Sequence, residues 1–140
     1  MDNKTIALAK FLGEPVENLR NNGENYFQVV DGFEYLVLTD EEADQVAQAY
    51  IADSLWAFNA NFIIDTCRLA SSSNVTSSLR QMQNEYCEGC NDFIGALVDR
   101  TCGIDKFTEQ AILADGRGHF IGQYDGKENE CDGLYIYRID

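Results

Sequence analysis

The stretch YFQVVDGFEYLVLTDEE at residues 26–42 decides the fold. Two runs rich in β-branched and aromatic residues flank Asp31-Gly32, and this dipeptide between such runs is the strongest short signal for a β-hairpin. Thr39 follows directly, with Glu42 three positions later, which is the spacing of a capping box at the start of a helix. The stretch therefore predicts a hairpin that leads into a long helix.

Apolar residues at helical spacing occupy most of the remaining chain. They predict a short amphipathic helix over residues 4–12 that ends at Gly13. Further helices are expected over residues 75–98, as one kinked or two separate helices, and over residues 104–114. The serine-rich residues 69–74 are expected to form a loop. The buried stripe of the long helix is predicted to comprise Ala47, Tyr50, Ile51, Ser54, Leu55, Phe58 and Phe62.

The C-terminal part of the chain is predicted to form a second hairpin. Residues 119–124 and 134–139 have the composition of strands, and the polar residues 125–133 between them are expected to form a loop. Residues 115–118 are expected to form a tight turn, with Arg117 paired to a nearby carboxylate. The predicted fold class is α+β, a small antiparallel sheet built from two hairpins and packed against a few helices, in a single domain over residues 1–140.

Charge and hydropathy exclude several classes of function. The chain has 10 Lys and Arg against 24 Asp and Glu, a formal net charge of −14 over 140 residues. Nucleic-acid binding requires cations that neutralise phosphates, so direct binding of DNA or RNA is not expected. No stretch approaches the ~18 consecutive apolar residues of a membrane span, and residues 1–12 lack the pattern of a signal peptide. We therefore expect a cytoplasmic protein with no membrane contact.

The cysteines are expected to be free thiols. Five of them in a reducing compartment indicate buried or half-buried thiols rather than a disulfide framework. Cys87 and Cys90 have the spacing of half a zinc site, but no second such pair follows, and His119 is the only histidine. We therefore expect no metal and no other cofactor, with zinc at Cys87 and Cys90 left open.

No residue pattern indicates catalysis. His119 has no Cys or Ser partner with a recognisable local signature. The glycine-rich residues 115–119 match neither a P-loop nor a dinucleotide-binding fingerprint, because no helix is expected to follow them. Residues 125–130 are a poor calcium loop, because Lys127 stands at a ligand position. We therefore predict that the protein is not an enzyme and has no catalytic residues.

The distribution of charge is the most informative feature. Residues 21–67 contain no Lys or Arg but nine Asp or Glu. The helix dipole favours Asp40 and its two neighbours in the first turn of the long helix, so local chemistry explains these acids. It does not explain Asp44, which repeats the charge of Asp40 one turn later with no compensating cation expected nearby. A surface that only keeps the protein soluble and a surface that imitates a polyanion both fit this pattern.

Three further segments carry a recognisable pattern, namely LVLTDEEAD at residues 36–44, LWAFN at residues 55–59 and DGRGHF at residues 115–120. Together they resemble a group of uncharacterised small acidic proteins of tailed bacteriophages and prophages. The resemblance extends from about Lys4 to the C-terminus. It implies a phage setting and no mechanism. Small acidic phage products often block a host nuclease or defence system, and this is an argument by analogy.

The leading hypothesis is a non-enzymatic phage-encoded inhibitor in the host bacterial cytoplasm. Its acidic surface would imitate nucleic acid and bind a host nucleic-acid-handling defence protein, a CRISPR effector or a restriction enzyme. The predicted partner-binding residues are Glu34, Asp40, Glu41, Asp44, Asp53, Glu128, Glu130 and Asp132.

Two alternatives belong to other classes of protein. The first is a protein-interaction or assembly module with an apolar contact surface, for which a homodimer is left open. Its expected anchors are Phe27, Tyr35, Trp56 and Tyr137. The second is a small enzyme that uses His119 and Arg117 at the glycine-rich turn.

Overall fold

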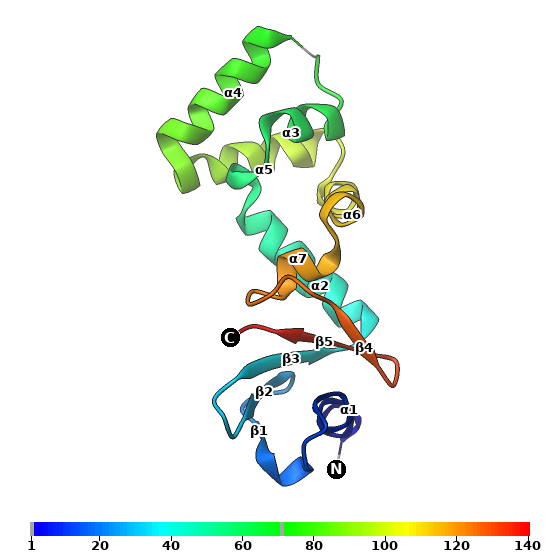
Figure 1. The fold of residues 1–140 in the computed structure, drawn as a ribbon. Coiled ribbons are helices and arrows are strands. Elements are labelled where there is room, and N and C mark those ends of the chain that lie inside the picture. The colour runs from blue at the N-terminus through cyan, green and yellow to red at the C-terminus, as the bar shows by residue number, and fades with distance from the viewer. Residues whose placement is uncertain (1, 71) are drawn as a thin grey trace. The chain divides into compact units, whose positions relative to one another are not determined.

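The computed structural model describes residues 2–70 and 72–140. It contains helices and a five-stranded antiparallel sheet (Figure 1), so the α+β prediction is confirmed. The chain divides into two compact units, which we call the sheet unit, Met1–Ala47 with Gly116–Asp140, and the helical unit, Gln48–Asp115. The single domain expected over residues 1–140 stays a prediction.

The described residues of the sheet unit form five short strands in the spatial order β1-β2-β3-β5-β4, each antiparallel to its neighbours. The first predicted hairpin corresponds to the pair β2–β3, whereas only the second strand of the other predicted hairpin is found, as β5, which pairs with β4 and with β3. The elements of this unit are α1 (Asn3–Leu12), β1 (Leu19–Asn21), β2 (Tyr26–Val29), β3 (Glu34–Leu38), the start of α2 (Asp40–Asp53), α7 (Arg117–Ile121), β4 (Asn129–Cys131) and β5 (Leu134–Arg138).

The first hairpin is confirmed, but its loop is one residue longer than a two-residue turn. The backbone N–H of Val29 donates to the carbonyl of Phe33 at 2.9 Å, and the backbone N–H of Gly32 donates to the carbonyl of Val29 at 2.7 Å, so residues 30–32 form the loop. Gly32 has a φ of +93°, so it is the left-handed residue that completes a three-residue hairpin loop. The glycine of the Asp-Gly pair therefore ends a three-residue loop instead of standing second in a two-residue one.

The second hairpin lies further along the chain than the sequence predicts. Residues 117–121 form helix α7, so the strand expected over residues 119–124 is wrong. The partner of β5 is β4, inside the segment expected to be a polar loop. Asp132 and Gly133 connect the two strands, with φ of +54° and +78°. A pair of left-handed residues fits the right-handed twist of a hairpin, and this turn overrides the weak strand propensity of β4.

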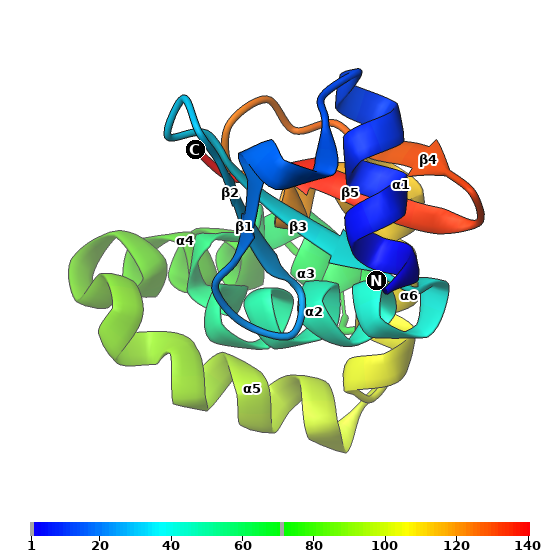
Figure 2. The same cartoon turned by 90° about the horizontal axis from the view of Figure 1, so that it is seen from below.

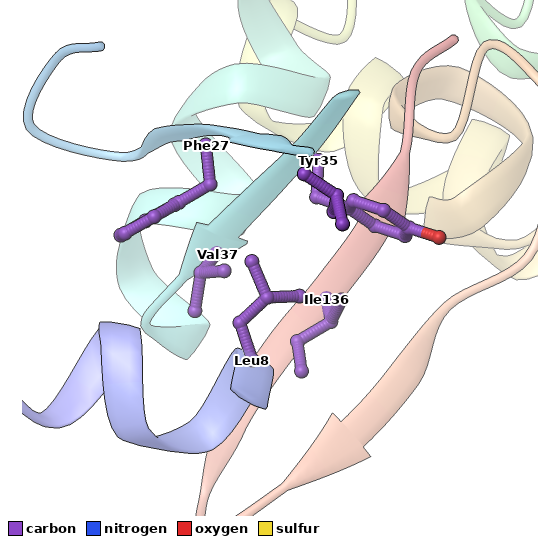
Figure 3. Packing of buried hydrophobic residues seen from close by; sticks show 6 residues of the cluster. Leu8, Phe27, Tyr35, Val37 and Ile136 are labelled. Carbon is purple, nitrogen blue, oxygen red and sulfur yellow. The ribbon is translucent and has the colours of Figure 1, made fainter. Parts of the chain in front are cut away.

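Helix α1 packs its apolar face on one side of the sheet (Figure 2). Leu8 points from α1 into a buried cluster with Phe27, Val37 and Ile136 from three neighbouring strands (Figure 3). Side chains two positions apart on a strand share a face, so Tyr35 joins the same cluster beside Val37. Gly13 ends α1 with a φ of +69°, as predicted.

The capping box at the start of α2 is confirmed in both directions. The backbone N–H of Glu42 donates to the Thr39 hydroxyl at 3.2 Å, and the backbone N–H of Thr39 donates to the Glu42 carboxylate at 2.9 Å. Lys4 of α1 donates to the same carboxylate at 2.7 Å. Glu42 therefore joins the first turn of α2 to α1.

Within its described residues, the helical unit contains the end of α2 and four further helices. They are α3 (Ala60–Thr66), α4 (Ser73–Tyr86), α5 (Asn91–Arg100) and α6 (Ile104–Asp115), with 3₁₀ turns at Leu55–Ala57 and Cys87–Cys90. The helix expected over residues 75–98 is therefore two helices joined by a kink. Ser72 caps α4, so residues 73 and 74 of the expected loop are helical, and residue 71 lies outside the described residues.

The long helix predicted through Phe62 is broken between Ser54 and Asn59. The side chain of Asn91 donates to the carbonyl of Ala52 and accepts from the backbone N–H of Trp56, at 2.8 and 3.0 Å. Gln83 donates to the carbonyls of Trp56 and Phe58 at 3.0 and 2.6 Å. The side-chain amides of Asn91 and Gln83 thus satisfy backbone groups near the break. Both residues are distant in the sequence, so no local pattern predicts these hydrogen bonds.

The predicted stripe is buried only in part. Ala47, Ile51 and Leu55 are buried, whereas Tyr50 is exposed. Beyond the break, the Phe58 and Phe62 rings both contact the ring of Phe107 from α6 edge-on, at centroid distances of 5.1 and 5.4 Å. After the break, Phe58 and Phe62 therefore form an aromatic cluster with Phe107 instead of continuing the stripe of α2.

Glu42 should make the stability of the protein depend on pH. Its pKa is lowered to about 2, chiefly by the hydrogen bond from Lys4 and then by the backbone N–H of Thr39. A carboxylate with a depressed pKa stabilises the folded state above its unfolded pKa, and this contribution is lost as the pH falls toward the folded value. We expect the unfolding free energy of the wild type to fall more steeply from pH 5 to pH 2.5 than that of Glu42→Gln, in urea titrations. Parallel curves for the two proteins would contradict this role.

Candidate functional site

Arg117 gathers three carboxylates in the sheet unit. Its Nη1 donates to Oδ1 of Asp40 at 2.8 Å and to Oδ1 of Asp44 at 2.9 Å, and its Nε donates to Oε1 of Glu128 at 2.6 Å. Nη1 also reaches the backbone carbonyl of Asp40 at 3.1 Å. We call these four residues the Arg117 cluster. The expected pairing of Arg117 with a carboxylate is confirmed, and the expectation that Asp44 has no cation nearby is wrong.

Burial differs sharply within the Arg117 cluster. The Arg117 side chain is 10% exposed, whereas the side chains of Asp40 and Asp44 are 70% and 62% exposed. Burial alone would disfavour the charged guanidinium, but the hydrogen bonds to Glu128, Asp40 and Asp44 outweigh it and raise the pKa of Arg117. The cluster thus consists of a fixed internal cation with carboxylates that still face solvent.

Two tyrosines of β5 complete the surroundings of the guanidinium. The Arg117 guanidinium lies over the ring of Tyr135, with its carbon 4.6 Å from the ring centroid. The Tyr137 hydroxyl donates to the same oxygen of Glu128 that Arg117 binds. Burial, followed by this hydrogen bond to Glu128, raises the pKa of Tyr137, so the hydroxyl stays a donor.

Glycines around Arg117 allow the backbone to come close. A Cβ atom on Gly118 would lie 2.7 Å from the backbone nitrogen of Glu128, and one on Gly122 would lie 2.9 Å from the carbonyl oxygen of Lys127. Gly116 precedes α7 with a φ of +86°. The DGRGHFIG sequence is thus a helix entry packed directly on the segment that presents Glu128, and a helix does follow the glycine-rich turn.

The other predicted partner-binding residues lie outside the Arg117 cluster. Asp132 pairs with Lys10 of α1 at 3.0 Å, and Glu34 accepts a hydrogen bond from the Tyr26 hydroxyl. The side chains of Glu41, Glu130 and Asp53 make no hydrogen bond or ion pair within the described residues. Glu41 belongs to the same first turn of α2 as Asp40, whereas Asp53 belongs to the helical unit. The structure therefore brings together Asp40, Asp44 and Glu128, with Glu41 next in the chain.

The residues of the two alternative hypotheses have different surroundings. Phe27, Tyr35 and Tyr137 are buried, so three of the four expected apolar anchors face the interior. Trp56 is half-buried. His119 is exposed on α7, and its ring contacts Phe120 edge-on. Its expected catalytic partner Arg117 is already bound to three carboxylates.

The cysteines are free thiols in the structure. Cys87 is exposed and Cys90 is buried, with its Sγ donating to the carbonyl of Cys87 at 3.1 Å. In the described parts of the chain, no three His, Cys, Asp or Glu side chains gather in a way that could hold a metal ion. Within residues 2–70 and 72–140, no helix is both long and apolar enough to cross a lipid bilayer.

Comparison with known proteins gives no relative. No protein-family model matches the chain, and neither a curated protein nor a solved structure is similar to it. The resemblance to phage proteins stays a prediction, and the function has to be argued from the residues themselves.

Removing the guanidinium should destabilise the sheet unit. In Arg117→Gln, the three carboxylates of the cluster lose their shared cation. Because Asp40 and Asp44 are largely solvated, we expect a modest loss of about 1–2 kcal/mol of unfolding free energy in urea titrations. Arg20→Gln is the matched control, since Arg20 is an exposed arginine of β1 with no ion pair within the described residues. Equal effects of the two substitutions would contradict a role of the cluster in stability.

The close packing at Gly118 should tolerate no side chain. We expect Gly118→Ala to lower the unfolding free energy by about 2–3 kcal/mol, because the new Cβ would meet backbone atoms rather than a flexible side chain. Gly23→Ala adds the same methyl group in the same unit, where its nearest neighbour, the Cβ of Tyr26, is 3.8 Å away. This control should change stability by less than about 1 kcal/mol. A Gly118→Ala protein as stable as the control would show that α7 is not held at this distance.

Proposed function

We propose that the protein is a non-enzymatic inhibitor that binds a nucleic-acid-handling protein through carboxylates of α2. The observation that carries the proposal is the Arg117 cluster, in which Asp40 and Asp44 are ordered by an internal cation while most of each side chain stays exposed. The binding surface consists of these two residues with Glu41, and we call it the α2 acidic surface.

The order of these carboxylates favours binding. Each aspartate uses its Oδ1 in the contact with Arg117, which leaves the second oxygen of the same carboxylate for an incoming donor. Fixing a side chain on binding costs roughly 0.5–1.5 kcal/mol of conformational entropy, and a side chain that is already held loses less. Arginine and lysine side chains that normally bind phosphates would form charge-assisted hydrogen bonds with these oxygens.

The excess of negative charge also favours a partner with arginine and lysine side chains that bind phosphates. In the Arg117 cluster, three carboxylates and one guanidinium leave two negative charges in excess, and Glu41 adds a third. The whole chain carries a formal net charge of −14. Such a field speeds encounters with a basic groove and repels nucleic acid itself. A protein partner with a phosphate-binding groove is therefore favoured over a nucleic acid.

The resemblance to phage proteins narrows the proposed partner. A phage product in the host cytoplasm meets CRISPR effectors and restriction enzymes, which hold DNA or RNA in basic channels. We propose one of these as the target. The assembly-module and enzyme alternatives have no comparable observation in their favour, since most of the expected apolar anchors are buried and Arg117 is engaged.

The experiment that tests the proposal is capture with competition. The 140-residue protein is immobilised, exposed to a bacterial lysate, and eluted with double-stranded DNA. We expect DNA to release a nuclease that purified protein inhibits, with an affinity that falls at least tenfold between 50 and 200 mM salt, as in binding to several phosphates. A nuclease bound equally well with and without DNA would overturn the proposal.

A pair of charge reversals locates the contact. Glu41→Lys changes the α2 acidic surface without touching the contacts of Arg117, and it should weaken inhibition about tenfold or more. Asp65→Lys changes the net charge by the same amount on α3, at an exposed side chain with no ion pair within the described residues. This control should leave inhibition within about twofold of the wild type. Equal losses for the two variants would indicate that only the total charge matters.

A further inference from the structure

Two of the free cysteines in the helical unit lie side by side. The Sγ atoms of Cys67 and Cys102 are 3.9 Å apart, although the residues are 35 positions apart in the sequence. Cys67 ends α3, and Cys102 lies in the turn between α5 and α6. Helix packing, and not local sequence, therefore places these two thiols together.

We propose that Cys67 and Cys102 form a dithiol site that is oxidised reversibly to a disulfide by low-molecular-weight disulfides such as oxidised glutathione. The sulfur atoms of a disulfide are about 2.05 Å apart, so the two Sγ atoms, which are 3.9 Å apart, have to move closer by roughly 2 Å for the bond to form. The Cys87–Cys90 pair lacks this arrangement. There, Cys90 donates its thiol hydrogen to a backbone carbonyl, and Cys87 is directed at the carbonyl of Asn84.

Burial assigns the order of the two exchange steps. Cys67 is 4% exposed and Cys102 is half-buried, so oxidised glutathione meets Cys102 first. The Cys102 thiolate attacks one sulfur of oxidised glutathione, and one glutathione leaves as its thiolate. Cys67 then gives up its proton and attacks Sγ of Cys102 as the thiolate, the bond to the second glutathione breaks, and that glutathione leaves as a thiolate that takes up a proton. The two cysteines together lose two electrons and two protons, which the two glutathione thiols carry away.

Burial also explains why Cys67 acts second. Its surroundings raise the pKa of the Cys67 thiol, so this group stays protonated and unreactive toward reagents in solution. Once the mixed disulfide has formed at Cys102, the attacking sulfur is already in contact with its target. The high effective concentration of a neighbouring thiol then drives the second step.

The disulfide would join the end of α3 to the turn after α5. The enclosed segment contains α4 and α5, and closing a loop of this length removes much of the freedom of the unfolded chain. Oxidation should therefore stabilise the helical unit against unfolding, and reduction should reverse the effect. The site would make the stability of this unit sensitive to the thiol–disulfide balance of its compartment.

The test is oxidation of the 140-residue protein with oxidised glutathione. Digestion without reductant and mass spectrometry should give a peptide pair that joins Cys67 to Cys102, with two of the five thiols lost. The Tm should rise by roughly 5–15 °C and return on treatment with dithiothreitol. A glutathione adduct that persists on Cys102, a Cys87–Cys90 link in its place, or an unchanged Tm in the linked protein would each overturn the proposal.

Two variants separate this site from the other cysteines. Cys87→Ser with Cys90→Ser should keep both the cross-link and the rise in Tm. Cys102→Ser should lose both, and its circular dichroism should match that of the reduced wild type. If Cys102→Ser does not fold, the peptide map of the wild type still decides, because it requires no substitution.

Discussion

A nearly enclosed positive charge, the Arg117 guanidinium, joins three segments of the sheet unit. The Arg117 side chain is almost enclosed, and an enclosed guanidinium is stable only where acceptors surround it. The acceptors come from separate segments, namely the start of α2 and the residue before β4. Gly118 and Gly122, both after Arg117, allow the backbone of α7 to lie close to residues 126–128, and the Arg117 Nε reaches Oε1 of Glu128 at 2.6 Å. One side chain therefore fixes how three segments meet.

The carboxylates of Asp40 and Asp44 thus contribute to the structure of the sheet unit and are also accessible from solvent. Although Asp40 and Asp44 are both paired with Arg117, more than half of each side chain remains exposed to solvent. A cation below the surface orders them without neutralising them in full. Lys4 acts in a similar way on Glu42, which lies at the junction of α1 and α2. Three acidic side chains of α2 are therefore held by ion pairs with Lys4 and Arg117. In this they differ from a run of acidic residues that contact only solvent.

Local patterns in the sequence predicted the hairpin of residues 26–38, the capping box at Thr39 and the end of α1 at Gly13, because each depends on neighbouring residues. Predictions failed where distant residues decide. At the break after Asp53, the side chains of Asn91 and Gln83 donate hydrogen bonds to the backbone carbonyls of Ala52 and Trp56. The cation for Asp44 comes from residue 117.

The strand order has a consequence for how this protein meets other molecules. The two outer strands of the sheet, β1 and β4, are each three residues long. Short edges offer few backbone groups to a foreign strand, which limits both aggregation and recognition by strand addition. Lys10 of α1 pairs with Asp132 in the turn that follows β4, at 3.0 Å. A partner that added a strand at either edge would therefore gain few backbone hydrogen bonds.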